Sequence, residues 1–299
     1  MCGLVGLHLR DPALFPQLGH FMTTMLCQVA DRGPDSAGVA VYGDPRMSPP
    51  GRTAVSLLSS GVDLATLVAS VQAQLPGTDV GGHDAGQSVV VNAATGTDQL
   101  LNAVRLAAPG ALVIGYGRDL AVIKGIGHPQ ALAAEMGLEQ AQGWQGVAHT
   151  RMATESAVTP AGSHPFSVGP DQCLIHNGSF ANHATIRREL RAEGVAFDSD
   201  NDSEVGARFV AAQLAGGADL DKALRLLCER FDGFYTLLVS TRDSFAVVRD
   251  AIACKPALIA ETAQWVAMAS EYRALTYLPG VDSARIFEPE PEEVYAWQR

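Results

Sequence analysis

The sequence lacks the closely spaced cysteine pairs from which metal sites and redox centres are built. Its five cysteines stand far apart, at positions 2, 27, 173, 228 and 254. Structural zinc sites and thiol–disulfide motifs need cysteines only a few residues from each other. The odd and scattered set therefore excludes these classes of site, and we expect reduced thiols and a cytoplasmic protein.

Basic residues are also few, which argues against a nucleic-acid partner. Lys and Arg together number 21, Asp and Glu number 32, and the net charge is −11. Proteins that bind nucleic acids neutralise phosphate groups with clustered Lys and Arg side chains. This chain has no basic run, so we expect no nucleic-acid interface.

Long apolar runs are missing as well. A membrane helix needs about 20 consecutive apolar residues, and no stretch of this sequence approaches that length. The start of the chain does not match a signal peptide either, because His8, Arg10 and Asp11 interrupt its short apolar segment. We therefore expect neither a membrane partner nor export.

The residues that are present predict a folded protein with an inserted segment. Hydrophobic residues make up 47% and charged residues 18% of the 299 positions, which is ordinary for a globular chain. A chain of this length forms one large domain or two small ones. The stretch from about 53 to 139 is poor in aromatic residues, and its patterns predict a small α/β insert with helices at 54–75 and 98–107.

Outside the insert, the patterns predict helices and an antiparallel sheet. Apolar residues recur at helical spacing over four stretches, 14–29, 183–193, 204–214 and 220–230. Strand patterns occur at 233–240, 244–249, 257–260 and 265–269. Strands that follow one another without an intervening helix pair in antiparallel fashion. The sequence therefore predicts an α+β protein.

The opening residues MCGLVGL place a cysteine directly after the initiator methionine. Aminopeptidases remove a first methionine when the next side chain is small, so we expect the mature chain to begin at Cys2. That residue then carries a thiol and a free α-amine, whose pKa of about 7.7–8.0 suits it as the base that takes the thiol proton. A cysteine at this position is a coincidence in most proteins, so the rest of the sequence must decide.

Two arginines stand in motifs that allow two interpretations each. The stretch RGPDSAG (32–38) is a turn with a proline and a capping aspartate, or a segment in which Arg32 braces the turn carrying the cysteine. In AHTRMAT, Arg151 is a solvated surface residue or, inside a cleft, a planar fork that fits the α-carboxylate of an amino acid. We expect His149 in the same motif to be a core residue.

Polar residues in two further motifs are also ambiguous. In IHNG, Asn177 and Gly178 form a simple turn or supply an amide and a backbone N–H to an oxyanion hole. In SDNDSE, an acid such as Asp202 caps the helix that follows, or it faces the ammonium group of a ligand. The second interpretation would complement a carboxylate clamp at Arg151.

Taken together and in order, the motifs MCGLVG, RGPDSAG, AHTRMAT, HPF, IHNG and SDNDSEV resemble the class II glutamine amidotransferases. These are the N-terminal nucleophile glutaminase domains of glucosamine-phosphate synthase, amidophosphoribosyltransferase, asparagine synthetase and glutamate synthase. The resemblance covers residues 2–52 and about 140–275. It implies a single amidotransferase domain over 2–299, interrupted by the insertion at about 53–139.

The resemblance implies a four-layer αββα sandwich in which two antiparallel sheets pack face to face, together with the small α/β insert. It implies that Cys2 is the nucleophile and that Arg32 orders its loop. Asn177 and Gly178 match the oxyanion hole. The remaining matched positions concern the substrate: Arg151 matches the residue that binds the α-carboxylate of glutamine, Asp202 the residue that binds its α-ammonium group, and Thr154 a pocket position.

Two positions depart from the wording of the glucosamine-phosphate enzymes. Met152 replaces a common aromatic residue, and Glu155 replaces a histidine. These changes affect the shape of the pocket and its signalling to other domains, and they leave the nucleophile unaltered.

The segment VADRGPDSAGVAVYG resembles stand-alone amidotransferase subunits of glutamate-synthase-like complexes, including N-methylglutamate synthase. The chain ends soon after the ASEYRAL segment, so we expect the ammonia acceptor site on other polypeptides. In such a hetero-oligomer, partner synthase subunits would hold FMN and iron–sulfur clusters, and this chain would hold no cofactor. The expected reaction is hydrolysis of L-glutamine with delivery of ammonia to that partner.

Two other functions stay open from the sequence. The chain could be a catalytically weak regulatory or scaffolding subunit of the same kind of complex, binding glutamine or glutamate without significant turnover. It could also be another N-terminal nucleophile hydrolase, although such an enzyme has no need for Arg151 and Asp202 together.

Overall fold

The computed structural model describes residues 2–58, 61, 63–152 and 158–299. In this part of the chain, the larger of two facing sheets has seven strands, all paired in antiparallel fashion. Its strand order is β14 (Arg285–Phe287), β12 (Leu258–Glu261), β13 (Trp265–Ala269), β1 (Gly3–Leu9), β8 (Gln145–Arg151), β2 (Ser36–Tyr42) and β7 (Leu120–Ile126). The strand that follows Cys2 therefore lies in the interior of this sheet.

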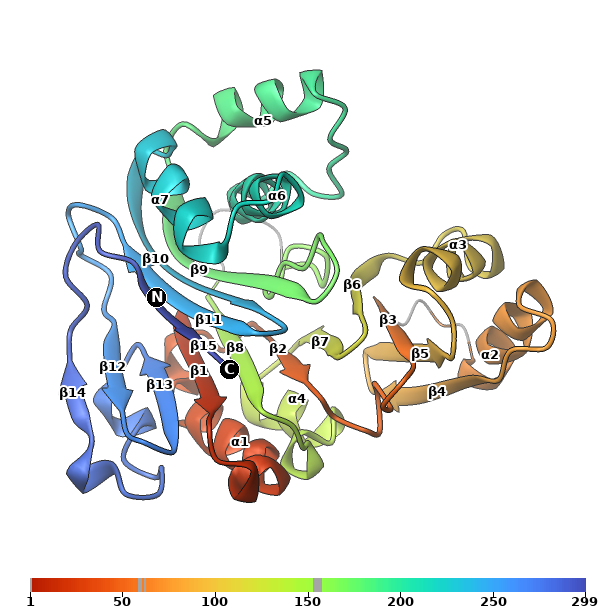
Figure 1. Ribbon diagram of the computed structural model, residues 1–299, viewed down its shortest axis with the longest axis horizontal. Coiled ribbons are helices and arrows are strands. Elements are labelled where there is room, and N and C mark those ends of the chain that lie inside the picture. Colours follow the sequence, from red (N-terminus) through yellow and green to blue (C-terminus); the bar gives the residue numbers. More distant parts are fainter. Residues whose placement is uncertain (1, 59–60, 62, 153–157) are drawn as a thin grey trace.

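The second sheet is also antiparallel and has four strands within the described residues. Its order is β15 (Tyr295–Gln298), β11 (Ser244–Arg249), β10 (Gly233–Thr241) and β9 (Gln172–Phe180). Helices cover the outer face of each sheet (Figure 1). They are α5 (His183–Ala192), α6 (Asp202–Ala215) and α7 (Leu220–Arg230) on the smaller sheet, and α1 (Leu18–Gln28) and α4 (Pro129–Glu135) on the larger one.

Three apolar layers hold these elements together. One lies between α1 and the larger sheet, one lies between the two sheets, and one lies between the smaller sheet and helices α5–α7. Strand β1 shows how the layers form: Leu7 belongs to the layer under α1, whereas Leu4 belongs to the layer between the sheets, because side chains alternate along a strand. The α+β class and the four-layer sandwich expected from the sequence are confirmed.

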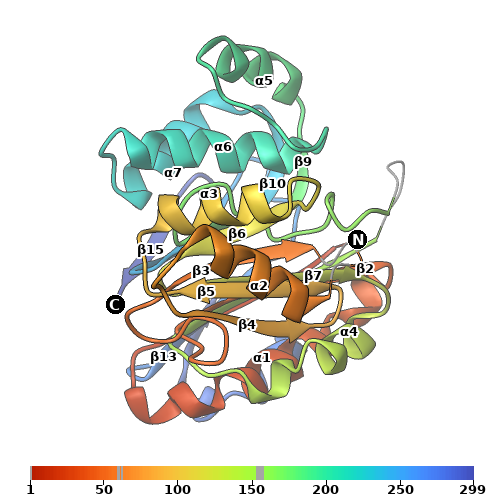
Figure 2. The ribbon, with the colours of Figure 1, turned by 90° about the vertical axis from the view of Figure 1, so that its right-hand side faces the viewer.

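A separate four-stranded sheet forms the insert (Figure 2). Its strand order is β4 (Val80–Ala85), β5 (Ser88–Ala93), β3 (Thr53–Leu58) and β6 (Val113–Gly117), and it carries α2 (Leu64–Gln74) and α3 (Thr97–Ala107) around an apolar core of its own. This sheet ends at Gly117, earlier than the boundary at about 139 expected from the sequence. The following residues belong to the body of the protein, because β7 pairs with β2 and α4 packs against the apolar layer under α1.

The helix expected at 54–75 is wrong in its first part. Residues Thr53–Leu58 form β3, and the helix α2 begins only at Leu64, where the Asp63 side chain accepts a hydrogen bond from Thr66 N. Strand β3 lies inside its sheet, between β5 and β6, and its first five residues are buried, so both of its faces are covered. A strand buried on both faces has a continuous apolar sequence that does not differ from that of a buried helix.

The insert covers the outer edge of β7. Ser56 Oγ accepts a hydrogen bond from Val122 N at 2.9 Å, and Ser88 Oγ accepts one from Lys124 N at 3.0 Å. Ser88 Oγ also donates to Lys124 O at 3.0 Å. Side chains of the insert therefore satisfy backbone groups that an edge strand otherwise leaves to solvent or to another strand.

The two main sheets lie close together at Gly6 on β1. A Cβ atom at this position would lie 2.4 Å from Leu238 Cδ2 and 2.9 Å from Phe245 Cε2, both on the facing sheet. Those distances are shorter than any ordinary carbon–carbon contact. Only glycine therefore allows the sheets to pack at this spacing beside the start of the chain.

We predict that Gly6→Ala lowers the free energy of unfolding by about 1–3 kcal/mol, because the added methyl group overpacks the layer between the sheets. Urea denaturation measures the change. Gly110→Ala is the matched control, since a Cβ at Gly110 meets no atom within 4 Å, and it is expected to shift stability by less than about 0.5 kcal/mol. Equal effects of the two variants would contradict the packing argument.

Candidate active site

Cys2 directly precedes β1, at one end of this central strand of the larger sheet. The pairing of β1 with β8 places Gly3 opposite Thr150, and Gly3 N donates to Thr150 Oγ1 at 3.2 Å. Leu4 N is likewise held by Ser270 Oγ at 3.0 Å. Because the backbone just after Cys2 is fixed on both sides, the position of the cysteine is defined by the sheet.

The carbonyl group of Cys2 is held by a partly buried ion pair. Arg32 Nε donates to Cys2 O at 3.0 Å, while Arg32 Nη1 donates to Glu271 Oε1 at 2.9 Å. Glu271 also pairs with Arg273 Nε at 2.7 Å. The structure thus places Arg32 against the backbone of the cysteine, as the second interpretation of the RGPDSAG motif expects. Glu271 is the partner that the sequence pattern did not indicate.

Arg151 ends strand β8 beside the same motif. Its backbone runs so close to Gly33 that a Cβ on that glycine would lie 2.5 Å from Arg151 N, and Asp35 N donates to Arg151 O at 3.1 Å. Arg151 is only 8% exposed, and its Nη1 donates to Gly162 O at 3.2 Å. The residue is therefore a buried cation, not a solvated surface arginine.

Asn177 and Gly178 lie within strand β9, opposite Thr236 and Tyr235 of β10, and not in a turn. Gly178 has φ +147°, and a Cβ there would lie 2.0 Å from Phe234 O, so only glycine fits. Asn177 is 3% exposed, and its Nδ2 lies 3.4 Å from Cys2 O. The amide of the second sheet therefore contacts the cysteine of the first.

Asp202 is the first residue of α6, but it is not the N-cap. The cap is Asn201, whose side chain accepts from Ser203 N at 2.9 Å. Asp202 Oδ2 instead accepts from Phe180 N at 2.8 Å, which ties the start of α6 to the end of β9. The carboxylate is thereby directed to the strand that carries Asn177.

These residues meet in one cleft of about 1080 Å³. Its walls include Cys2, Arg151, Asn177, Gly178 and Asp202. Thr154, the remaining position expected in the pocket, lies outside the described residues.

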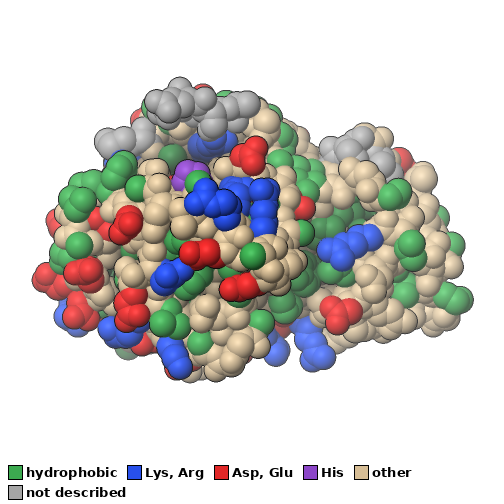
Figure 3. All heavy atoms as spheres, turned by 90° about the horizontal axis from the view of Figure 1, so that it is seen from above, with side chains coloured by type: hydrophobic (Ala, Val, Ile, Leu, Met, Phe, Trp, Pro, Cys, Tyr) green, Lys and Arg blue, Asp and Glu red, His purple; other side chains and the backbone are tan. Residues whose placement is uncertain are grey.

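Other charged and aromatic residues also line the cleft. Lys255 and Phe234 line it, with the Lys255 Nζ 4.9 Å from the centre of the Phe234 ring. Asp198 and Asp200 add negative charge to the wall. The outer face above helices α5–α7 carries basic and acidic side chains side by side, with neither sign covering it (Figure 3). Within the cleft itself, cations and carboxylates are likewise both available to a zwitterionic ligand.

Three buried histidines lie at the cleft, and two of them, His164 and His176, line it. The rings of His149 and His164 stack with centroids 4.1 Å apart, and His176 Nδ1 contacts Ser203 Oγ at 2.8 Å. Burial lowers the pKa of His149 to about 3 and that of His176 to about 4, and it holds the pKa of His164 well below the usual value. Among the described residues, His149 Nδ1, His176 Nε2 and both ring nitrogens of His164 have no hydrogen-bond partner. The three rings are therefore neutral at physiological pH.

Lys124 holds the loop that forms another wall of the cleft. Its Nζ donates to Ser163 O at 2.8 Å and lies 5.2 Å from the centre of the Phe166 ring. The side chain is almost fully buried, and burial lowers the pKa of Lys124 to about 7. The loop therefore owes its position to a cation that is costly to desolvate.

The described part of the chain offers neither a metal-ligand cluster nor a membrane-spanning helix. Across 2–58, 61, 63–152 and 158–299, no group of three or more His, Cys, Asp or Glu side chains is placed to hold a metal ion. In the same ranges, no helix has the length and apolar character that crossing a bilayer requires. The cysteines at 2, 27, 173, 228 and 254 are all free thiols.

Comparison with known proteins gives a consistent result. Residues 149–277 match a family model described as a glutamine amidotransferase domain. The glutamine amidotransferase-like protein GlxB of Rhizobium meliloti (strain 1021) is 46% identical over 302 residues, covering 99% of this chain and 98% of the relative. A putative glutamine amidotransferase of Methanothermobacter thermautotrophicus is 27% identical, with 100% of both chains covered.

The fold is shared with a solved amidotransferase. The glutamine phosphoribosylpyrophosphate amidotransferase of B. subtilis superposes with a TM-score of 0.61 at 17% identity, covering 99% of this chain and 49% of that one. This likeness concerns the fold alone. Together with the relative that is 46% identical over nearly the whole of both chains, it shows that this chain belongs to the class II glutamine amidotransferases.

Proposed function

We propose that this chain is the glutaminase subunit of an amidotransferase complex, with Cys2 as its N-terminal nucleophile. The observation that supports this most directly is the meeting of Cys2, Arg151, Asn177, Gly178 and Asp202 in a single cleft. They come from four separate parts of the sequence. Each of them supplies a different chemical group that hydrolysis of a free amino acid amide needs.

Glutamine binds by its two charged ends in this proposal. The guanidinium group of Arg151 receives the α-carboxylate, and the carboxylate of Asp202 receives the α-ammonium group. Thr154 is assigned to the pocket on the resemblance alone. A ligand held at both ends presents its side-chain amide to the cysteine in a fixed orientation, which lowers the entropic part of the barrier.

The chemical steps follow from the groups around Cys2. After removal of Met1, the free α-amine takes the thiol proton, and the thiolate attacks the carboxamide carbon. The negative charge that develops on the carbonyl oxygen is stabilised by Asn177 Nδ2 and Gly178 N–H. The C–N bond breaks, the leaving nitrogen takes the proton from the α-amine, and ammonia departs. Water then hydrolyses the γ-glutamyl thioester to glutamate and regenerates the thiol.

Arg32 has a supporting role in this proposal. By holding the Cys2 carbonyl group on one side and Glu271 on the other, it keeps the first residue of the mature chain in one conformation. A chain terminus that is not tied down in this way frays. The nucleophile therefore needs a brace because it stands at the end of the polypeptide.

We assign the ammonia to a partner synthase subunit in a cytoplasmic hetero-oligomer of the glutamate-synthase-like kind, a class that includes N-methylglutamate synthase. The amidotransferase part of this proposal is supported by the similarity to the glutamine amidotransferase-like protein GlxB, which extends over nearly the whole of both chains. FMN and iron–sulfur clusters belong to the partner subunits in this proposal. The competing function is a subunit that binds glutamine without turning it over.

Replacing the nucleophile tests the proposal. We expect Cys2→Ala to lower the rate of glutamine hydrolysis by about 10³-fold or more, because no other group can form the thioester. Release of ammonia and glutamate is measured with the purified chain, alone and with its partner subunits. Cys254→Ala, which removes an exposed thiol, is the matched control and is expected to keep the wild-type rate.

Undiminished hydrolysis by Cys2→Ala would show that Cys2 is not the nucleophile. If the wild-type chain binds glutamine but turns it over neither alone nor with its partner, the chain is the binding subunit instead. Mass spectrometry of the intact protein checks the mechanism independently: retention of Met1 would block the α-amine and rule out its use as the base.

The buried histidines take no part in proton transfer in this scheme. A general base works best when its pKa lies near the working pH, whereas burial lowers the pKa of His149 and His176 to about 3 and about 4. Their neutral state affects stability instead. In the unfolded chain the same side chains titrate near 6.5.

We predict that the free energy of unfolding falls as the pH drops below about 6.5. In that range the unfolded chain binds protons on these histidines and the folded chain does not, so each group costs about 1.4 kcal/mol per pH unit until its folded pKa is reached. Urea denaturation at pH 7.5, 6.5 and 5.5 measures the slope. His164→Phe should flatten it, whereas Phe166→Leu should lower stability at every pH with the slope unchanged. An unchanged slope in His164→Phe would contradict the argument.

A further inference from the structure

The segment 198–201 between α5 and α6 forms one wall of the cleft and leads directly into Asp202. It has no regular secondary structure. A loop of this kind keeps a defined shape only when its backbone N–H and C=O groups have fixed partners. The residues that supply these partners therefore determine the position of this wall of the cleft.

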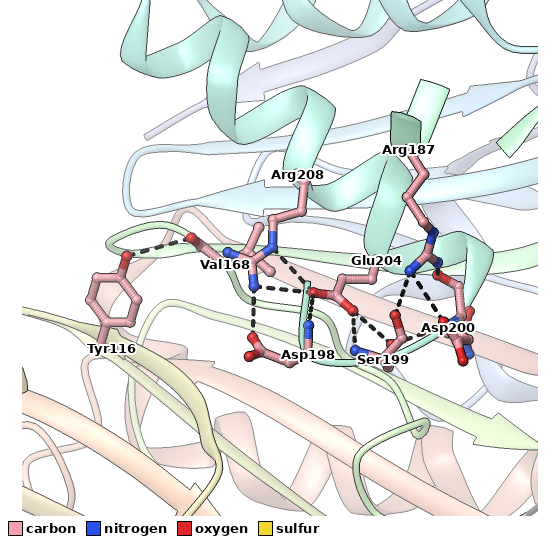
Figure 4. Close-up of polar contacts among 9 residues, drawn as sticks. Tyr116, Val168, Arg187, Asp198, Ser199, Asp200, Glu204 and Arg208 are labelled. Atoms are coloured by element: carbon pink, nitrogen blue, oxygen red, sulfur yellow. Dashed lines mark hydrogen bonds and ion pairs between the residues drawn. The ribbon is translucent and has the colours of Figure 1, made fainter. Parts of the chain in front are cut away.

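One buried carboxylate holds the N–H groups of this loop. Glu204 is 2% exposed, and its oxygens accept hydrogen bonds from Asp198 N at 2.9 Å and from Ser199 N at 2.7 Å. Ser199 Oγ donates to the same carboxylate at 2.7 Å (Figure 4). Arg208, one turn along α6, pairs with it at 3.0 Å and balances its charge.

These contacts differ from ordinary helix capping. Asn201 is the N-cap of α6, so Glu204 stands at the third helical position, where a glutamate normally closes a capping box on the N-cap N–H. Here Asn201 N donates to Ser199 Oγ at 3.3 Å instead. The Glu204 side chain reaches past the cap to the loop, so helix capping does not explain its position.

A buried arginine holds the carbonyl groups of the same loop. Arg187 is 7% exposed, and it donates from Nη1 to Ser199 O at 2.6 Å and from Nη2 to Asn201 O at 2.9 Å (Figure 4). The loop is thus fixed through its N–H groups by α6 and through its C=O groups by α5. We refer to Glu204 and Arg187 together as the loop clamp.

The loop clamp also connects the two ends of the amino-acid site. Asn201 Nδ2 donates to Gly162 O at 3.2 Å, and Arg151 Nη1 donates to the same oxygen at 3.2 Å. The residue after Asn201 is Asp202. A shift of the loop therefore changes the separation between the guanidinium group of Arg151 and the carboxylate of Asp202.

The outer side of the clamp faces the insert. Arg208 pairs with Asp198 at 2.7 Å as well as with Glu204, and Tyr116 of the insert donates to Val168 O at 3.4 Å nearby (Figure 4). A small cavity of about 30 Å³ lies between the insert, the loop and Glu204. Glu204 and residues of the insert therefore line the same small cavity.

We propose that Glu204 and Arg187 are positioning residues that set the spacing between the carboxylate-binding and ammonium-binding ends of the glutamine site. This inference rests on the proposed function of Arg151 and Asp202. The clamp residues touch the loop backbone and not the substrate. Their loss therefore weakens recognition of the α-amino group and leaves the cysteine chemistry in place.

The test compares two substrates, L-glutamine and glutaramate, which is glutamine without its α-amino group. For Glu204→Gln we expect kcat/KM for glutamine to fall about tenfold through a higher KM, because two loop N–H groups lose their charged acceptor. For glutaramate we expect a change of less than about threefold, since this substrate makes no contact with Asp202. The ratio of kcat/KM for glutamine to kcat/KM for glutaramate is therefore expected to fall at least about threefold.

The matched control is Asp221→Asn on α7. Asp221 pairs with Arg225 four residues later, as Glu204 pairs with Arg208, but that pair is exposed and far from the loop in sequence. We expect wild-type kcat/KM for both substrates in this variant. Should Glu204→Gln fail to fold, Arg187→Lys supplies the same comparison, because it replaces the two separate guanidinium nitrogens that donate to Ser199 O and Asn201 O by a single nitrogen without the planar fork.

An equal loss for both substrates, or no loss for either, would overturn the proposal. Failure of the proposed function is a different result, namely an inactive wild-type chain with and without its partner. In that case calorimetry on the full chain carrying Cys2→Ala, with and without Glu204→Gln, measures binding of glutamine and glutaramate directly. A clamp variant that weakens both ligands equally, or neither, then contradicts the positioning role.

Discussion

The register of β1 against β8 is the constraint on which the site depends. Gly3 pairs with Thr150, so Cys2 and Arg151 lie side by side at adjacent ends of the neighbouring strands β1 and β8. Ser36 of β2 lies opposite Arg151 on the other side, which brings the RGPDSAG segment to the same place. Because side chains alternate between the faces of a sheet, a slip of one residue would reverse the core and separate these groups. Both faces of β1 are buried but carry different side chains, so the register that packs the core also fixes the site.

The predictable parts of the fold are those with a local periodic signal. Helix α7 and strands β10 and β11 match the expected ranges closely, since each carries its own spacing of apolar residues and ends at turn residues. Strand β3 could not be recognised, because burial on both faces removes the alternation. Strand β15 was missed because a short edge strand with half-exposed residues has almost no pattern of its own.

The residues of the site likewise divide into those that a sequence motif indicates and those that it does not. Cys2, Arg151 and Asn177 could be found in the sequence because each supplies a reactive or charged group within a distinctive motif. Gly162 could not, since it contributes only a carbonyl oxygen, and any residue type has one. Glu271 contacts Arg32 across 239 positions of sequence. Glu204 fits the pattern of a capping box, and only the three-dimensional contacts show that it serves the loop instead.

The serine contacts along β7 have a consequence for assembly. Ser56 and Ser88 occupy the hydrogen-bonding positions at Val122 and Lys124 that a further strand would use. Another polypeptide therefore cannot extend the larger sheet by adding a strand at this side, and misfolded copies have no template there for edge-to-edge polymerisation. A subunit that joins the molecule near β7 must recognise side chains of the insert, which makes that association dependent on sequence and not on backbone geometry.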